Sequence, residues 1–511
     1  MEFAPSPLAS FLAAALFFVT IILHLRRRPT RKYNLPPGPR PWPVIGNLNL
    51  IGPLPHRSIH ELSARYGPLM SLRFGSFPVV VGSSADMARF FLKTHDLAFL
   101  DRPVTAAGKY TTYNNAGIFW SPYGAYWRQW RKLSQAELFT ARRLASLEHV
   151  RAEEVRSMLR DLHAAVASAA AAAAGGRGVA LREHLYMVTL NVISRMVLGR
   201  KYVVDGAGSP TTPEEFRRMI DEQFVLNGAL NVGDMIPWLA WLDLQGYVRR
   251  MKRLAKVFDR FLEHVLDEHD ERRHREGKGF VAVDMVDVLL ELADDPSLEV
   301  PIGRDGVKAF TLDLIGGGTD TSAVTVEWTM SELLRHPDVL TKATEELDRV
   351  IGSDRLVAEE DIPNLPYMEA IVKETMRLHP VAPLLAPRLS REDTSMDGYD
   401  IPVGTRVFVN VWAIGRDPAV WGDDAEEFRP ERFVGSKRGR QGAGHGAAAV
   451  RVGATDVPGL RARAHDGAAD AGEPGARLRV EAPRRRGAGG AEHGGEIRDV
   501  HAASCPARGC R

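Results

Sequence analysis

The stretch LIGGGTDTSAVTVEW, Leu314–Trp328, places three consecutive glycines inside a run with the apolar spacing of a helix. Each glycine in a helix interior costs roughly 0.5–1 kcal/mol relative to alanine. A helix tolerates that cost where a bulky group must approach its backbone or where it widens locally. Asp320 and Thr321 follow, and a buried carboxylate beside a hydroxyl can relay protons into an apolar cavity. The alternative is a close crossing of two helices in which these two residues only cap backbone groups.

A second motif, KETMRLHP (Lys373–Pro380), places Glu374 and Arg377 three residues apart, on one face of a helix. A lone pair at this spacing on a surface contributes only ~0.3–0.5 kcal/mol. Further along, FRPERF (Phe428–Phe433) supplies Arg432 in an aromatic setting. Two guanidinium groups on one carboxylate would form a rigid interior network, which is the alternative to a surface ion pair.

A third segment, WSPYGAYWRQWRKL (Trp120–Leu133), places Trp127 and Arg131 four residues apart. The indole N–H and the guanidinium can then donate to one anionic group together. An amphipathic helix with a basic face is the alternative for this segment. In PLLAPRLSRED (Pro383–Asp393), Arg388 is another candidate contact for an anion.

The composition excludes some classes of protein. The 511 residues are 45% hydrophobic and 25% charged, which is ordinary for a globular chain with a large core. The net charge of +2 gives no reason to expect nucleic-acid binding. Both cysteines, Cys505 and Cys510, lie at the C-terminus, so residues 1–436 cannot form a disulfide or a cysteine-ligated metal site. That usage suits a reducing compartment such as the cytosol.

The N-terminal residues have the pattern of a membrane anchor. The apolar run Leu8–Leu25 is close to the ~20 residues that a spanning helix needs. The basic segment RRRPTRK (Arg26–Lys32) follows it and favours a cytosolic position for the rest of the chain. A cleaved signal peptide is the alternative, but arginines stand where cleavage would occur. We therefore expect a retained anchor with its basic flank over residues 1–32, followed by a stiff proline-rich hinge over residues 33–49.

The body of the chain, residues 50–436, has mainly helical patterns with short strand signals. Gly67–Ser83 predicts a hairpin, and Gly398–Gly415 predicts another short strand pair. Glu214–Leu230 and Tyr247–Glu268 predict amphipathic helices. The alanine- and glycine-rich stretch Ala164–Gly178 is interpreted as a surface loop.

Each motif is weak alone, but their order and spacing together are specific. From residue 1 to about Ser436 the chain resembles the cytochrome P-450 family of haem-thiolate mono-oxygenases, in particular the plant microsomal type. The resemblance implies a mainly α fold with small β-sheets and a haem cofactor. It also implies electrons from an NADPH-cytochrome reductase, a small apolar substrate, and a catalytic domain that faces the cytosol from the endoplasmic reticulum membrane.

The resemblance also assigns roles to the motifs quoted above. The helix that carries Gly317 and Gly318 would lie against the haem, with Asp320 and Thr321 as the proton-delivery pair. The residues that would hold the haem propionates are Trp127, Arg131 and Arg388. The structural triad behind the haem would be Glu374, Arg377 and Arg432.

The C-terminal segment departs from the family. The family requires a segment Phe-x-x-Gly-x-Arg-x-Cys-x-Gly, whose cysteine thiolate is the axial iron ligand. This sequence lacks it, so it offers no metal ligand of that kind. Residues 437–511 instead contain 15 Gly, 17 Ala and 13 Arg among 75 positions, and no Phe, Trp or Tyr. Such a segment cannot bury enough apolar surface to offset chain entropy, so we expect a disordered tail and a fold that is incomplete at its C-terminus.

The genetic code suggests an origin for this tail. Synonymous codons for Val450–Gly459, VRVGATDVPG, read one nucleotide later, give Phe-Gly-Ser-Gly-Arg-Arg-Met-Cys-Pro-Gly. The codons for Leu460–Pro483 can likewise specify Ser-Gly-Leu-Ala-Arg-Met-Thr-Val-Arg-Leu-Thr-Leu-Ala-Asn-Leu-Val-His-Gly-Phe-Ala-Trp-Arg-Leu, an amphipathic helix followed by the start of a strand. The tail is therefore interpreted as a frame-shifted translation that begins near Ser436. The core behind the haem would then be left open.

Two hypotheses for function follow. The first is a membrane-anchored mono-oxygenase that inserts one oxygen of O2 into a small apolar secondary metabolite. The second is an inactive, haemless remnant or a non-catalytic binder of apolar ligands, which the missing cysteine favours for the chain as it stands.

Overall fold

The computed structural model describes residues 33–172, 179–202, 211–352 and 354–434, and two short strands at Arg479–Glu481 and His501–Ala503. The expected anchor, residues 1–32, lies outside the described residues, as does most of the tail. Both expectations stay predictions. Among the described helices, none combines the length and the apolar character needed to cross a bilayer.

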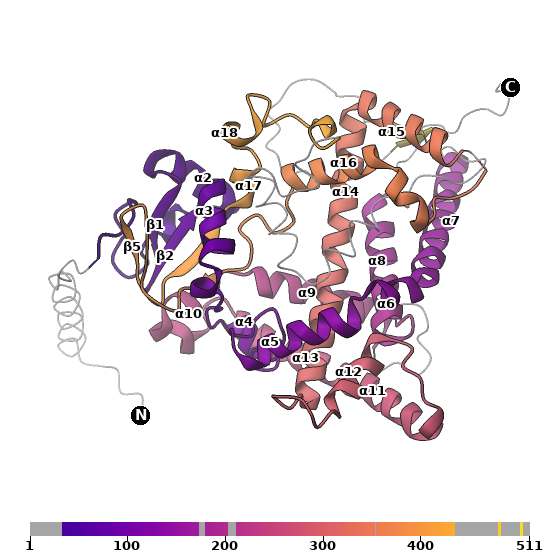
Figure 1. The fold of residues 1–511 in the computed structure, drawn as a ribbon, viewed down its shortest axis with the longest axis horizontal. Coiled ribbons are helices and arrows are strands. Elements are labelled where there is room, and N and C mark those ends of the chain that lie inside the picture. Colours follow the sequence, from indigo (N-terminus) through magenta and orange to yellow (C-terminus); the bar gives the residue numbers. More distant parts are fainter. Residues whose placement is uncertain are drawn as a thin grey trace, which may run out of the picture.

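Helices dominate the described chain, as predicted (Figure 1). They are α2 (Pro55–Tyr66), α3 (Ala85–Arg89), α4 (Ala106–Thr111), α5 (Ala125–Leu133), α6 (Ala141–Ser146), α7 (Glu148–Ala172), α8 (Leu181–Leu198), α9 (Pro213–Gly228), α10 (Val232–Met235), α11 (Tyr247–Glu276), α12 (Met285–Ala293), α13 (Arg304–Gly318), α14 (Asp320–Arg335), α15 (Pro337–Val350), α16 (Pro366–Leu378), α17 (Val411–Ile414) and α18 (Pro418–Trp421). The helices expected from Glu214 and from Tyr247 are α9 and α11, so both predictions are confirmed.

The strands β1 to β6 form two small sheets at one side of the molecule, away from α7, and β7 and β8 pair in a separate two-stranded sheet (Figure 1). They are β1 (Leu69–Phe74), β2 (Phe77–Gly82), β3 (Arg388–Leu389), β4 (Thr394–Met396), β5 (Tyr399–Ile401), β6 (Arg406–Val409), β7 (Arg479–Glu481) and β8 (His501–Ala503). The predicted hairpin is confirmed, because β1 and β2 are antiparallel around Gly75, whose φ of +58° suits a tight turn. The four-stranded sheet has the order β1-β2-β6-β3.

Two sequence-based expectations were wrong. The strands within Gly398–Gly415 do not pair with each other: β5 pairs with β4, and β6 lies parallel to β2. The β5–β6 connection turns at Gly404, where φ is +79°, and sends the two strands to different sheets. The predicted loop from Ala164 is also helical as far as Ala172, because α7 continues through the alanines. Alanine has the highest helix propensity of all residues.

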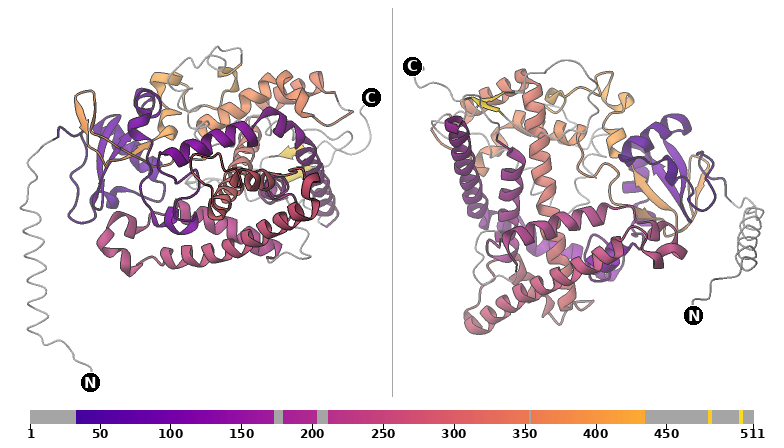
Figure 2. Two further views of the ribbon diagram at one scale, coloured as in Figure 1. Left: turned by 60° about the horizontal axis from the view of Figure 1, so that its bottom comes forward. Right: turned by 180° about the vertical axis from the view of Figure 1, so that it is seen from behind.

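The helical part packs around α8, α13 and α14. In Figure 1, α14 runs through the centre of the molecule with α8 beside it, and Figure 2 shows the same arrangement from behind. The largest core cluster joins buried side chains of eight α-helices, for example Trp130 of α5, Leu190 of α8 and Phe310 of α13. The prediction of a mainly α fold with small β-sheets is therefore confirmed.

Candidate active site

The glycine-rich segment lies where two helices meet. α13 ends at Gly318, Thr319 has the dihedral angles φ −84° and ψ −79°, and α14 begins at Asp320. The three glycines have different surroundings. A Cβ placed on Gly318 would lie 2.3 Å from Cδ1 of Ile193 in α8, whereas a Cβ on Gly316 or Gly317 would meet no atom within 4 Å. Gly318 thus allows a close helix crossing, and the other two leave one face of the helix open to a bulky partner.

Asp320 and Thr321 are adjacent, but no hydrogen bond joins their side chains in the described structure. The hydroxyl of Thr321 donates to the carbonyl oxygen of Gly317 at 2.8 Å. Burial raises the pKa of Asp320, Arg182 opposes that shift, and Asp221 adds to it. An acid whose proton is held more tightly than usual, beside a hydroxyl on an interrupted helix, has the chemistry of a proton relay.

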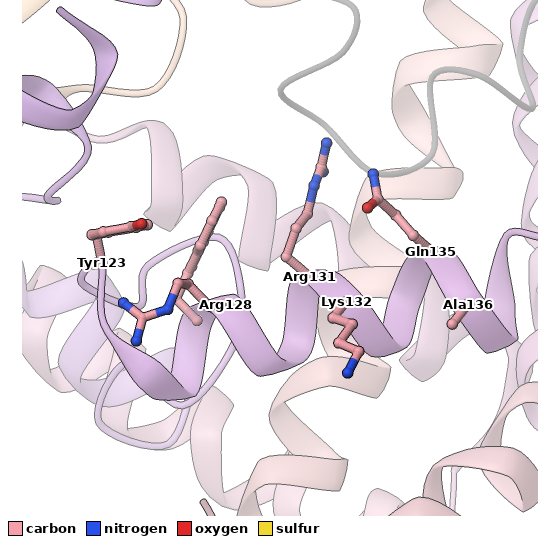
Figure 3. Close-up of a pocket in the computed structure, with 7 residues that line it drawn as sticks. Tyr123, Arg128, Arg131, Lys132, Gln135 and Ala136 are labelled. Carbon is pink, nitrogen blue, oxygen red and sulfur yellow. The ribbon is translucent and has the colours of Figure 1, made fainter. Parts of the chain in front are cut away.

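Helix α5 carries several cationic side chains that line a pocket. Trp127 and Arg131 line a pocket of about 480 Å³ together with Tyr123, Arg128, Lys132, Gln135 and Ala136. In Figure 3, Arg131 of α5 and Gln135, which lies just after α5, extend to the same side, opposite Lys132. The helix is fixed from behind, because the buried indole of Trp130 stacks on Phe310 of α13 with ring centroids 4.3 Å apart. The structure thus brings Trp127 and Arg131 to one surface that suits an anion.

Arg388 does not line that pocket. It is buried in β3, and its neighbour Leu389 donates its backbone N–H to the carbonyl oxygen of Asp101 at 2.8 Å. The carboxylate of Asp101 accepts the backbone N–H of Tyr123 at 2.9 Å, just before α5. Asp101 therefore ties β3 to the start of α5. Sequence reasoning missed this residue, because nothing in its local pattern marks it.

The predicted triad forms one interior network. Both Glu374 and Arg377 have no exposed surface, and Nε and Nη2 of Arg377 each donate to the Glu374 carboxylate at 2.7 Å. Nε of Arg432 donates to the same carboxylate at 3.2 Å. Arg377 also donates to the carbonyl oxygens of Ala425 at 2.6 Å and Glu427 at 2.9 Å. The network fixes α16 to the segment that ends the described part of the domain.

Asp313 is a further site residue that sequence reasoning missed. It lies on α13 one turn before Gly317, and its carboxylate accepts the backbone N–H of Phe119 at 3.2 Å. Burial raises the pKa of Asp313 to about 7. The backbone N–H groups of Phe119 and Ile118, which donate to the carboxylate, lower this pKa but do not cancel the effect of burial. A Cβ on Gly117 would lie 2.4 Å from the carboxylate, so the loop before α5 must approach it without a side chain. The one sequence signal for Asp313 is its position one helical turn before Gly317.

These residues fit one part of a haem site and not another. The open face at Gly316 and Gly317 suits a large planar group, and the cationic surface of α5 suits carboxylates. An axial thiolate is missing from this set, since residues 33–434 contain no cysteine. The described residues therefore do not complete a haem-thiolate centre.

Comparison with known proteins identifies the family of this chain. The mainly helical fold with small sheets is the fold of solved cytochrome P450 structures. The Cytochrome P450 family model matches residues 36–446. The chain belongs to the cytochrome P450 family.

Individual relatives agree with this assignment. Dimethylnonatriene synthase of Zea mays is 51% identical over 450 residues, covering 85% of this chain and 83% of the relative. Trimethyltridecatetraene synthase of Zea mays is 52% identical, covering 84% and 79%. A zebrafish cytochrome P450 solved with abiraterone has a TM-score of 0.64 at 26% identity, covering 88% of this chain and 97% of that structure.

Proposed function

We propose that the chain is built as a mono-oxygenase that inserts one oxygen of O2 into a small, acyclic, terpenoid-like substrate. The family match carries the reaction class. The substrate class rests on the two maize relatives, both of which are named for unsaturated hydrocarbon products. Identities of 51% and 52% over most of both chains favour a related substrate, although a fold alone would not.

The site residues take the following roles in this proposal. Trp127 and Arg131 would hold the propionates of a haem, with Arg388 of β3 as a further candidate, and the haem would supply the activation of O2. Asp320 and Thr321 deliver protons to the open face of the helix, while Gly317 and Gly318 shape that face. Glu374, Arg377 and Arg432 keep the opposite side of the domain rigid. The raised pKa of Asp320 supports the relay, because a carboxyl group that holds its proton more tightly than usual is more often protonated and can donate that proton.

The proposed setting is the endoplasmic reticulum membrane. The apolar run and basic flank within residues 1–32 would anchor the chain with its catalytic domain in the cytosol. An NADPH-cytochrome reductase on the same membrane would supply electrons. Carbonate extraction of microsomes tests the anchor: the protein should stay in the pellet, and release into the supernatant would contradict it.

A specific observation favours a second candidate for the 511-residue chain as it stands. Its first 504 residues contain no cysteine, so the domain itself cannot provide the thiolate. In this alternative the chain is a haemless binder of apolar molecules or an inactive remnant.

One experiment separates the two candidates. The 511-residue chain is expressed with a reductase in microsomes, reduced and exposed to carbon monoxide, and NADPH-dependent oxidation of acyclic terpenoid alcohols is measured in parallel. A thiolate-type absorption band together with oxidised product supports the mono-oxygenase. The absence of both, with folded protein present, supports the haemless alternative.

A further inference from the structure

A buried cluster of charged side chains joins α11 to the start of α12, outside the candidate active site. His269 of α11 and Asp284 and Asp287 of α12 have exposed fractions of 6%, 1% and 0%. Figure 1 shows α11 and α12 side by side at the bottom of the view, and the two helices are in contact. None of the roles described above uses these residues.

Both ring nitrogens of His269 face oxygen atoms that accept hydrogen bonds. Nδ1 lies 2.7 Å from the carbonyl oxygen of Val265, one turn earlier in α11, and Nε2 lies 2.9 Å from Oδ2 of Asp284. A carbonyl oxygen can only accept, so Nδ1 carries a proton. A neutral imidazole would then present the lone pair of Nε2 to the carboxylate of Asp284. The contact at 2.9 Å therefore requires a second proton, between Nε2 and Oδ2.

The charges of the cluster balance when His269 carries that second proton. The guanidinium of Arg272, three residues further along α11, pairs with Asp287 and lies 3.8 Å from Oδ2 of Asp284. Two cations then face two carboxylates in the interior, and buried charges are stable only when they are paired. Loss of the proton would leave the cluster with an excess of negative charge.

The other ion pairs along α11 do not include the three residues around His269. These pairs are Arg200 with Glu268, His264 with Glu268, Arg273 with Asp270 and Asp294, Arg304 with Glu263, Asp267 and Asp270, Lys308 with Asp259 and Glu263, and Arg250 with Glu222. The proton balance at His269 is therefore set mainly by Asp284, Asp287 and Arg272.

The carboxylate of Asp284 also forms the beginning of α12. Its Oδ1 accepts the backbone N–H of Asp287 at 3.0 Å, and the carboxylate of Asp287 accepts the backbone N–H of Asp284 at 3.4 Å, which is a reciprocal capping box. A Cβ on Gly199, which directly follows α8, would lie 2.5 Å from Oδ2 of Asp284. Asp284 thus connects the end of α8, the middle of α11 and the start of α12.

We propose that the contact between His269 and Asp284 is a proton-dependent clasp, which holds the start of α12 against α11 and opens as the pH rises. When the proton leaves, the lone pair of Nε2 faces Oδ2 of Asp284. The resulting repulsion acts on the same carboxylate that caps α12. Residues 277–284, which connect the two helices, would be released first. The clasp goes beyond the proposed function, and it does not depend on haem.

The direction of the pH effect follows from the surroundings of His269. Burial lowers the pKa of this imidazole, but the hydrogen bond with Asp284, the charges of Asp284 and Asp287 and the carbonyl oxygen of Val265 outweigh burial, so the pKa is raised. The stability that a raised histidine pKa contributes is fully present below the ~6.5 of an unfolded chain. It is lost as the pH rises through the higher pKa of the folded state.

Two substitutions in the 511-residue protein separate the proton from the packing. Asp284→Asn keeps a side chain that caps helices, and its amide can donate to a neutral imidazole, so the contact no longer needs the second proton. His269→Gln removes the titrating ring. In both variants the fall in the midpoint of thermal unfolding between about pH 6.5 and 9 should be at most half of the fall in the unsubstituted protein.

His274→Gln is the matched control for these variants. His274 is exposed on the same helix, and its Nδ1 also lies 2.7 Å from a carbonyl oxygen one turn earlier, that of Asp270. The fall in the midpoint with pH should be the same in His274→Gln as in the unsubstituted protein.

Two further measurements report on the proton and on the release of the segment. Hydrogen–deuterium exchange at the imidazole C2 position, read by mass spectrometry, gives the titration midpoint of each histidine. The midpoint of His269 should lie above that of His274 and should fall in Asp284→Asn. Thermolysin should cut within residues 277–284 at least threefold faster at about pH 8.5 than at about pH 6.5, relative to a free peptide of that sequence. In Asp284→Asn this ratio should be close to one.

Three outcomes overturn the proposal. A midpoint of His269 at or below that of His274 would show that the cluster does not hold the second proton. Equal pH dependence of unfolding in all four proteins would show that the contact is only structural. Zn²⁺ that stabilises the unsubstituted protein but not Asp287→Asn would assign the cluster to a metal ion, because the ligand atoms of the three side chains lie within 4.8 Å of one another. If the variants do not fold, C2 exchange in the unsubstituted protein decides between the first outcome and the proposal.

Discussion

Glu374 and Arg377 form a bidentate ion pair within a single turn of α16, with neither residue exposed and both N–O distances at 2.7 Å. Around this pair, Arg432 donates to the same carboxylate, and the guanidinium of Arg377 reaches carbonyl oxygens 48 and 50 residues further along the chain. The pair thus joins two parts of the domain that are distant in sequence.

Replacement of Glu374 by alanine should prevent stable folding. The change leaves Arg377 without a carboxylate partner in the interior, while Arg432 keeps Asp424. Removing one partner of a buried pair typically costs ~3–5 kcal/mol. We expect loss of soluble protein or a large fall in the midpoint of thermal unfolding. Glu369→Ala on the same helix is the control, because Glu369 is about half exposed and its ion-pair partner among the described residues is Lys373. Equal behaviour of the two variants would show that the network contributes little.

Alanine at Gly318 and alanine at Gly317 should have opposite effects. At Gly318 the new Cβ meets Ile193 at 2.3 Å, and overpacking of this kind costs roughly 1–3 kcal/mol. At Gly317 the space is open, so alanine should be neutral or stabilise by up to ~0.5–1 kcal/mol. Urea unfolding of both variants measures the difference. Ile193→Ala should rescue Gly318→Ala, and a failure to rescue would place the strain elsewhere.

Asp313 should make the folded domain less stable as pH rises. Its pKa is about 7 in the folded state, above the ~3.9 of an unfolded chain, so between these values the folded state binds more protons. Stability is then greatest at low pH and falls as pH rises through this window. In Asp313→Asn this part of the slope should disappear, and the variant should be the more stable protein at about pH 8. Thermal unfolding from about pH 5 to 8 measures stability against pH for the unsubstituted protein and for Asp313→Asn. If the two curves are parallel, the pKa of Asp313 is not raised in the folded state.

The 511-residue chain should give no thiolate-type spectrum with carbon monoxide. Cys505 and Cys510 lie in a tail without aromatic residues, and a ligating thiolate needs fixed donors around it. A coding sequence returned to the neighbouring frame near codon 437 should recover the spectrum. A purified, unchanged chain that shows the thiolate band would refute the frame-shift interpretation of the tail.

The sequence by itself determined the kinds of element and the family. The positions of α9, α11 and the β1–β2 hairpin follow from periodicity and turn residues, which act over a few neighbouring positions. The motif Glu374-x-x-Arg377 placed its two residues on one helix face for the same local reason. The absence of cysteine before residue 505 was also visible without a structure.

Only the tertiary structure decided which distant residues meet. It placed Arg432 on Glu374, Asp313 under the backbone of Phe119, and Ile193 against Gly318. It also separated β5 from β6, although local pattern suggested that they pair. These contacts depend on helices and strands packing across large sequence separations, where burial and close fit select partners that no local pattern encodes.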